Sequence, residues 1–147
     1  MNGRGARLAR LQAIRGLSEG IKRTELARAL ALVAEVETVL VQQKAMQADA
    51  KIATRAALDA GERGEWLLAE AQGEVAGWNC ERLRGLLRVR TEAVAPAMRG
   101  FIESRREHEQ VKQLVEDERR AQEIERDRRA QATADDWFLS RRGRGME

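Results

Sequence analysis

Tyrosine is absent from this chain of 147 residues, and aromatic residues of all kinds make up only 3% of it. The chain therefore lacks the large side chains that normally dominate a globular core. Long apolar runs are also missing, since no stretch approaches the roughly 18 residues of a membrane-spanning helix. β-Branched residues never alternate with polar ones over a useful length, which argues against strands. The composition argues against both an ordinary globular domain and a transmembrane one.

Residues that usually carry chemistry are scarce as well. The single cysteine, Cys80, cannot form an intramolecular disulfide, and the single histidine, His108, cannot form a paired-histidine metal site. No glycine pattern of a nucleotide-binding loop is present. We therefore expect no catalytic residue, no metal, no cofactor, no small-molecule substrate and no enzymatic activity. His108 has helical spacing from Phe101 and Val111, so we interpret it as a residue of a helix seam or its boundary.

Charged residues, in contrast, make up 35% of the chain, and alanine, glutamate, leucine and arginine dominate. These residues enter helices easily and are typical of long helices and coiled coils. Two long stretches, Ile21–Ala60 and Phe101–Arg142, contain neither glycine nor proline, whereas six glycines and the only proline, Pro96, lie between them. We therefore predict a single all-α domain, a long antiparallel two-helix coiled-coil hairpin.

The glycines between the two stretches mark where the chain reverses. A reversal at Ala60–Trp66 would give unequal arms, and one at Gly73–Asn79 would give nearly equal arms. We prefer Gly73–Asn79, because residues 62–72 keep a helical pattern and equal arms can cover each other's seams. The predicted boundaries are frayed ends at 1–5 and 143–147, arm one at 6–72, the reversal at 73–79 and arm two at 80–140.

Apolar residues of the first arm recur at alternating spacings of four and three, the signature of a left-handed coiled-coil seam. The predicted seam comprises Leu32, Val36, Val39, Gln43, Met46, Ala50, Ala53, Ala57 and Ala60. It begins with large residues and ends with alanines, which bury less apolar area, so we expect the packing between the two arms to weaken toward Ala60. Gln43 is a polar interruption of the kind that sets the register of paired helices.

The second arm has a seam that matches the first, and it contains a proline that interrupts helical hydrogen bonding. Its predicted seam residues are Leu83, Leu87, Val94, Met98, Phe101 and Val111, with Arg90 among them. Pro96 removes one backbone hydrogen bond, so we expect a kink or a break near Glu92–Pro96. From Glu116 onward apolar residues are rare and opposite charges are spaced three or four residues apart, which stabilises an exposed helix.

The formal net charge is only +3, but it is unevenly distributed. Residues 1–28 carry seven basic and two acidic residues, whereas residues 29–80 carry four basic and eight acidic ones. Such a distribution is typical of a protein that docks by its ends. We do not expect a nucleic-acid partner, because that usually requires a stronger basic excess on one face.

The chain begins with an amphipathic segment. Apolar residues recur there every three or four positions and therefore share one helical face: Leu8, Leu11, Ile14, Leu17 and Ile21. Such a face beside arginines can lie on an anionic membrane surface. It can also pack against the C-terminal patch Trp137-Phe138-Leu139, which equal arms would bring level with it. We favour this second interpretation and expect membrane contact to be peripheral only.

Trp66 and Trp78 lie near the preferred reversal. Aromatic residues at the tip of a hairpin are typical anchors for a partner protein. The alternative is that the two rings cap a small core folded around the turn, and the sequence favours neither interpretation.

The order of these features resembles a known family. The start, "RLARLQAIRGLSEGIKRTELARALA", is a leucine-arginine helix that leads into an Ala/Leu/Glu-rich arm. The end, "RRAQATADDWFLSRR", combines basic residues, glutamine, paired acids, apolar residues and a last arginine: Arg128, Arg129, Gln131, Asp135, Asp136, Trp137 and Arg141. In these segments, in length and in arm layout, the chain resembles the flagellar export protein FliJ and its type III secretion stalk counterparts. Pro96 and the aromatic Trp137-Phe138 depart from the family pattern.

The resemblance implies a fold, partners and two contact regions. The family fold is an antiparallel two-helix coiled coil, similar to the central stalk of rotary ATP synthases. Its paired termini insert into the hexameric export ATPase, its tip faces the export gate protein, and members also bind export chaperones. The implied ATPase-ring contacts in this chain are Arg7, Leu8, Arg10, Leu11, Ile14, Arg15, Gln131, Asp135, Asp136 and Trp137. The implied gate contacts at the tip are Trp66, Leu67 and Trp78.

We expect a cytoplasmic location, because Arg10 and Arg15 interrupt any signal-peptide core, with at most peripheral contact at the inner membrane. A rival interpretation is a structural or nucleic-acid-associated coiled coil that dimerises through the same apolar seam. Salt-dependent DNA binding would favour a nucleic-acid role, and concentration-dependent helicity would favour the dimer.

Overall fold

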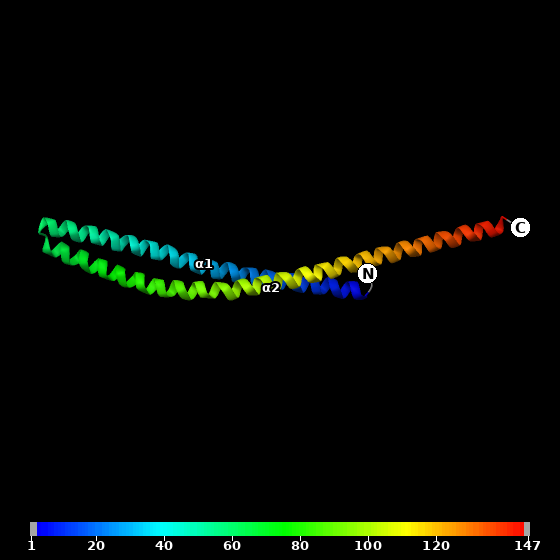
Figure 1. Cartoon of the computed structure of the whole chain (residues 1–147), viewed down its shortest axis with the longest axis horizontal. Helices are drawn as coiled ribbons and strands as arrows, with labels where there is room; N and C mark the ends of the chain where they lie inside the picture. The colour runs from blue at the N-terminus through cyan, green and yellow to red at the C-terminus, as the bar shows by residue number, and fades with distance from the viewer. Residues whose placement is uncertain (1–2, 146–147) are drawn as a thin grey trace. The chain divides into compact units, whose positions relative to one another are not determined.

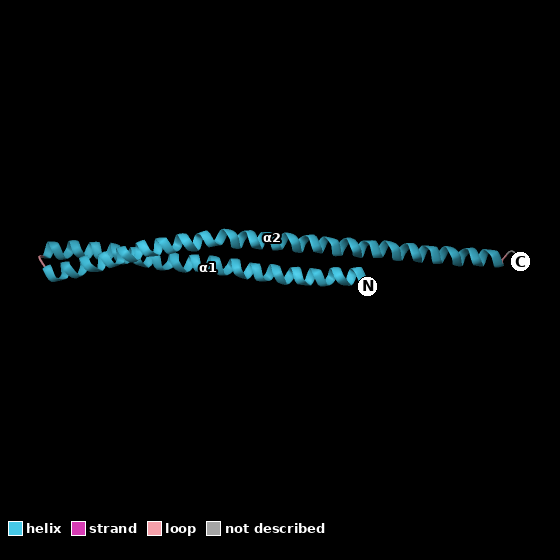
Figure 2. Cartoon of the chain, turned by 90° about the horizontal axis from the view of Figure 1, so that it is seen from below, coloured by secondary structure: helices cyan, strands magenta, loops and turns pink. Residues whose placement is uncertain are grey.

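The computed structural model describes residues 3–145, and almost all of them belong to two helices. Helix α1 is Gly3–Ala60 and helix α2 is Arg63–Arg144 (Figure 1). A short loop joins them (Figure 2), and the described residues contain no strand. The two helices pack against each other, so the predicted all-α helical hairpin is confirmed.

Gly61 ends α1 in a left-handed conformation, with a φ of 70°. Its N–H donates to the carbonyl of Leu58 (3.2 Å), and the N–H of Glu62 donates to the carbonyl of Ala57 (3.0 Å). These two hydrogen bonds form a Schellman motif, which satisfies the last carbonyls of a helix. The carbonyl of Glu62 then accepts the N–H of Trp66 (3.0 Å), so α2 begins at once. Gly61 therefore fixes the point at which the chain reverses.

Gly61→Val is expected to lower the free energy of unfolding by about 2 kcal/mol, because a β-branched side chain strains a left-handed backbone. Gly64, in the first turn of α2, is the matched control, since an added Cβ there would meet no atom within 4 Å. Gly64→Ala is expected to raise the free energy of unfolding by about 0.5 kcal/mol. Urea denaturation followed by circular dichroism measures both. Equal effects of the two variants would contradict a specific requirement for glycine at Gly61.

The preferred reversal at Gly73–Asn79 is wrong, and the alternative at Ala60–Trp66 contains the turn. Residues 73–79 are helical throughout. A Cβ added at Gly73 would stand 3.3 Å from Cβ of Ala50, so this glycine permits close helix packing instead of a turn. Arm one therefore ends at Ala60, and arm two is the longer of the two.

The hairpin comprises two compact units. The reversal unit, Ile21–Ile102, contains the turn. The terminal unit combines Met1–Gly20 with Glu103–Glu147, and the structure describes its residues 3–20 and 103–145. Each unit pairs a stretch of α1 with a stretch of α2.

In the reversal unit, both helices bury residues that are spaced alternately three and four positions apart, as a coiled-coil seam requires. The buried or half-buried residues of α1 along this line are Leu26, Ala29, Val33, Val36, Leu40, Gln43, Gln47, Ala50, Thr54 and Ala57. The corresponding residues of α2 are Trp66, Ala69, Gly73, Ala76, Cys80, Leu83, Leu87, Arg90, Val94, Ala97 and Phe101. The α2 seam residues predicted for this unit are among them, except Met98, which is 39% exposed.

The seam predicted for α1 is correct at every second position only. The correct positions are Val36, Gln43, Ala50 and Ala57. The residues predicted between them lie one position away from the line that packs on α2. They comprise half-buried Leu32 and exposed Val39, Met46, Ala53 and Ala60.

Two neighbouring lines of α1 explain this error. One line contains Val39 and Met46, the other contains Leu40, and both share the four correct positions. Val39 is 37% exposed and Met46 is 56% exposed, whereas Leu40 is 6% exposed. Both lines have the spacing of a seam, so the pattern of apolar residues in α1 cannot distinguish them. The packing of α1 against α2 buries the line that contains Leu40.

Pro96 does not break α2, which is continuous from Arg63 to Arg144. Of the predicted kink or break near Glu92–Pro96, the break is therefore wrong. Pro96 is exposed and lies outside the seam, between half-buried Val94 and Ala97. Its ring removes a single hydrogen bond on the solvent side, while seam contacts on both sides of it hold the helix.

The helices also extend closer to the chain ends than predicted. Helix α1 includes Gly3–Gly5, and α2 includes Gly143 and Arg144. The predicted fraying is therefore wrong for these residues. Residues 1–2 and 146–147, for which fraying was also predicted, lie outside the described residues.

Candidate partner-binding surfaces

Ion pairs and hydrogen bonds join the two helices of the terminal unit. Arg15 Nη1 lies 2.7 Å from Glu107 Oε2, and Arg4 Nε lies 3.4 Å from Glu118 Oε2. His108 shares a hydrogen bond with Glu19, and both side chains are largely buried. His108 is thus a seam residue that binds its partner helix, as the sequence predicts, and an added Cβ at Gly16 would lie 3.4 Å from its ring.

The apolar contribution to this part of the seam is small. Val111 is 6% exposed, in agreement with its predicted place in the seam, and Ser104 is the one buried polar residue of the described chain. Leu8 is half-buried. Ion pairs and the hydrogen bond between Glu19 and His108 therefore join the two helices here beside a small number of apolar residues.

This pairing contradicts the predicted contact between the N-terminal face and the Trp137-Phe138-Leu139 patch. The ion pairs place residues 4–15 beside residues 107–118. Trp137, Phe138 and Leu139 are 58%, 66% and 65% exposed. The equal arms assumed from the sequence would have brought the two segments level, and the turn at Gly61 does not allow this.

Residues 123–144 form what we call the C-terminal extension. Every residue of it is helical and exposed. The extension continues past Glu118, the partner of Arg4 near the start of α1, as Figure 1 shows at the red end of α2. At 1.5 Å per residue it is about 33 Å long. It is the largest part of the described chain without packing against another segment.

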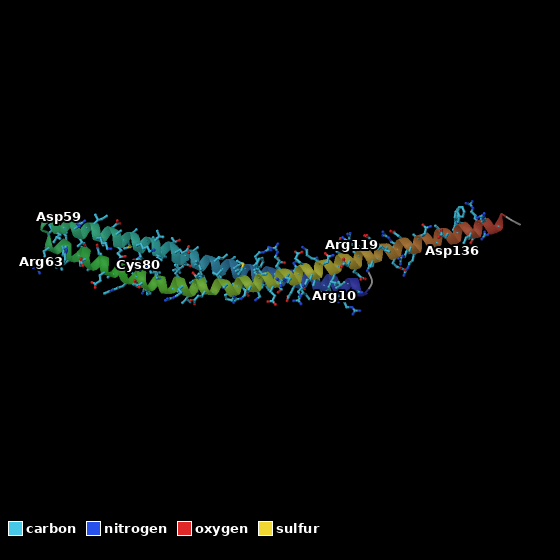
Figure 3. The ribbon with its side chains drawn as sticks, viewed as in Figure 1. Arg10, Asp59, Arg63, Cys80, Arg119 and Asp136 are labelled. Atoms are coloured by element: carbon cyan, nitrogen blue, oxygen red, sulfur yellow. The ribbon has the colours of Figure 1, made fainter. Side chains whose placement is uncertain are left out.

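Local charge pairs support the exposed helix around and within the extension. Arg119 lies 2.8 Å from Glu116 and 3.9 Å from Glu123. The hydrogen bond and charge of Glu116, with a smaller effect of Glu123, raise the pKa of Arg119 above its ordinary value. Arg129 Nε lies 3.2 Å from Glu125 Oε1. These contacts are exposed (Figure 3 labels Arg119), so each adds little, but together they favour the helix.

The polar and aromatic residues predicted for ring contact near the chain end lie on this extension. Gln131 donates to Asp135 Oδ1 at 3.0 Å, and Asp136 is exposed (Figure 3). The guanidinium of Arg141 lies over the Trp137 ring, 4.8 Å from its centre. The predicted C-terminal contacts are thus exposed and accessible to a partner.

The ring contacts predicted for α1 divide into two groups. Arg10, Leu11 and Ile14 face solvent, and Ile14 is 61% exposed. Exposed Arg7 donates from Nε to the carbonyl of Gly3 at 3.2 Å. Leu8 and Arg15 face α2, and the structure brings none of these residues beside those of the extension.

At the tip, the turn lies between Asp59 and Arg63 (Figure 3). A shallow hollow of about 320 Å³ there is lined by Ala57, Leu58, Gly61, Glu62, Arg63 and Trp66. Trp66 is half-buried at the end of the seam, whereas Leu67 is 52% exposed and Trp78 is 64% exposed. Trp66 therefore caps the seam. Trp78 lies about 18 Å further along α2 and is exposed enough to contact a partner protein.

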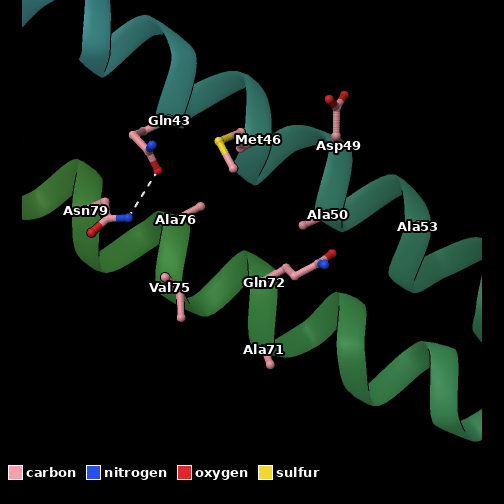
Figure 4. Close-up of a pocket in the computed structure, with 10 residues that line it drawn as sticks. All are labelled: Gln43, Met46, Asp49, Ala50, Ala53, Ala71, Gln72, Val75, Ala76 and Asn79. Carbon is pink, nitrogen blue, oxygen red and sulfur yellow. Dashed lines mark hydrogen bonds between the residues drawn. The ribbon is translucent and has the colours of Figure 1, made fainter.

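A groove that sequence reasoning missed lies on one flank of the reversal unit. It has a volume of about 570 Å³ and lies between Met46 of α1 and Val75 of α2 (Figure 4). Asn79 Nδ2 donates to Gln43 Oε1 at 3.2 Å beside it, which supports the predicted register role of Gln43. The groove was missed because Met46 was assigned to the seam.

No group of three or more His, Cys, Asp or Glu side chains in residues 3–145 could hold a metal ion. No helix within residues 3–145 is both long and apolar enough to cross a membrane.

Comparisons with known proteins do not assign a family. No protein-family model, no curated protein and no solved structure matches this chain.

Proposed function

We propose that this chain is a non-enzymatic central-stalk component of a type III protein export apparatus, flagellar or injectisome. In this proposal the terminal unit inserts into the hexameric export ATPase, the tip contacts the export gate protein, and export chaperones are further partners. The C-terminal extension is the observation that supports the proposal. It is exposed on every face, and it begins just beyond the ion pair of Arg4 with Glu118, which joins the start of α1 to α2. A helix that is polar on most faces either crosses solvent or binds a partner, and a ring is a partner that can surround it.

The proposed ring contacts form two groups. One group is Arg7, Arg10, Leu11 and Ile14 on α1, and the other is Gln131, Asp135, Asp136 and Trp137 on the extension. The ion pair of Arg4 with Glu118 places Arg7 level with residue 115, so the nearest members of the two groups lie about 24 Å apart along the helix direction. Leu8 and Arg15 act differently, because they face α2 and stabilise the pairing of the two helices. The ring would therefore bind the extension along its length and the start of α1 at its outer face.

Size-exclusion chromatography with light scattering, with and without a purified hexameric export ATPase, tests the proposal. We expect a complex with one copy of this chain per hexamer. A chain that elutes separately from the ATPase at every ratio would contradict the stalk function.

The tip assignment makes a separate prediction. Trp78→Ala is expected to weaken binding to the cytoplasmic part of the export gate protein about tenfold or more, because exposed tryptophans are frequent interface anchors. Val89→Ala is the matched control, since Val89 is 60% exposed on the same helix but lies further from the tip. Calorimetric titration measures both. Unchanged binding and unchanged secretion after replacement of Trp66 and Trp78 would rule out the tip assignment.

A structural or nucleic-acid-associated coiled coil that dimerises through the seam has weaker support. Seam residues such as Val36 and Ala76 are already covered by the other helix of the same chain. Such a dimer would require the hairpin to open.

A further inference from the structure

We propose that the C-terminal extension also pairs with the extension of a second copy of the chain, in antiparallel orientation. The pairing makes a symmetric dimer that leaves the seam of each hairpin intact. This inference goes beyond the proposed function, since it concerns the chain without its ATPase.

The first reason is that charge of opposite sign is separated along α2. Within the extension, residues 123–127 contain three acidic residues and one basic residue, whereas residues 140–144 contain three basic residues and no acidic one. Two parallel extensions would place like charges together. Two antiparallel extensions place the acidic start of each beside the basic end of the other, and complementary charge of this kind fixes the orientation of paired helices.

The second reason is the register that this orientation gives. When the two-fold axis passes between Thr133 and Ala134, Glu123 lies level with Arg144 of the second copy. Glu123, Ala130, Trp137 and Arg144 are spaced seven residues apart, so they share one face of the helix and can meet the same face of the second copy. Two-fold symmetry makes the Glu123–Arg144 pair occur twice. Both side chains are exposed, and the contact of Glu123 with Arg119 of its own chain is long, at 3.9 Å.

The same register places apolar and small residues together. Trp137 lies level with Ala130 of the second copy, and both belong to the face that carries Glu123 and Arg144. The residues around the axis are small, so two helices can approach closely there: Ala130, Ala132, Thr133 and Ala134. The Trp137 side chain, 58% exposed in the single chain, would thereby be covered.

The helix dipole does not account for the pattern by itself. Basic residues in the last turn are favourable in any helix, which explains Arg142 and Arg144. It does not explain the acidic stretch at the start of the extension, which lies far from a helix N-terminus. Arg142 and Arg144 form no ion pair with any other residue that the structure describes, so they are available to a second chain.

A charge exchange tests the proposal directly. The Glu123→Arg variant and the Arg144→Glu variant are each expected to self-associate about fivefold more weakly than the parent chain, because like charges then face each other in two places. An equimolar mixture of the two variants is expected to regain the parental association. Sedimentation velocity over a wide concentration range measures all three. Association of either variant at the parental level, or a mixture as weak as its components, would overturn the proposal.

Cysteine cross-linking tests the orientation independently of affinity. Ala134→Cys lies at the axis, so mild oxidation is expected to give a disulfide-linked dimer. Ser140→Cys is the matched control, because antiparallel pairing separates the two copies of residue 140 by about 20 Å. The parent chain is the negative control and is expected to form no disulfide-linked dimer, since its single cysteine, Cys80, is 1% exposed. Equal cross-linking at both positions would indicate parallel pairing, and no cross-linking at Ala134→Cys would exclude pairing of the extensions.

Both experiments use the chain alone, so their outcome is separable from the test of ring binding. A dimer that still joins the ATPase as one chain per ring supports both proposals. A monomer that joins the ring would overturn the dimer only, and a dimer that never joins it would overturn the stalk function only.

Discussion

Replacing Ala76 with glutamate is expected to lower the free energy of unfolding by about 3 kcal/mol. Ala76 is 2% exposed in the seam of the reversal unit, one turn from Cys80, which is 1% exposed. The helices are close there, since an added Cβ at Gly77 would lie 3.2 Å from Gln47 Nε2. A glutamate would bury a charge without a partner and force the helices apart. Urea denaturation followed by circular dichroism measures the change.

Ala71→Glu is the matched control for this substitution. Ala71 is an exposed alanine on the same helix, five residues earlier. Its replacement is expected to change the free energy of unfolding by no more than about 0.5 kcal/mol, because surface substitutions have small effects. Similar losses in the two variants would show that Ala76 does not face α1.

The double replacement Trp137→Ala/Phe138→Ala is expected to weaken binding to the hexameric export ATPase about a hundredfold, since aromatic anchors dominate interface energies. The side chains are 58% and 66% exposed, so stability of the hairpin should be unchanged. Fluorescence anisotropy of the labelled chain, titrated with the ATPase, measures the effect. This result would assign the aromatic patch to the ring contact.

Ile52→Ala is the control for the aromatic replacement. Ile52 is 70% exposed, and it lies in the reversal unit, which the proposal keeps outside the ring. Its replacement should leave ATPase binding unchanged. A larger effect at Ile52 than at the aromatic pair would place the ring contact in the reversal unit and contradict the proposed orientation of the stalk.

The position of the turn illustrates what the sequence leaves open. Gly61, Gly73 and Gly77 are equally permissive as residues, and a glycine-rich segment identifies a region without identifying a turn. Of these three glycines Gly61 alone adopts a positive φ, and the N–H groups of Gly61 and Glu62 make the hydrogen bonds of a helix end. Gly73 and Gly77 remain in α2 because they face α1, where the helices approach closely.

The candidate contacts follow from that turn. Trp137 and Asp136 were selected from the sequence, and both are exposed on the extension. Their separation from Leu11 and Ile14 on α1 could not be foreseen, because it depends on the twelve-residue or greater error in the position of the reversal. An error in the turn moves every residue of the second arm relative to the first.

By itself the sequence determined that the chain is helical, that it reverses once, and that a line of residues three and four positions apart joins the two arms. Helix formers and heptad spacing are local properties, so they act before any tertiary contact. Only the tertiary structure decided which of two neighbouring lines on α1 forms the seam, where the chain turns, and how much of α2 is left exposed. These choices depend on the fit between two helices, in which Leu40 is buried and Met46 is not.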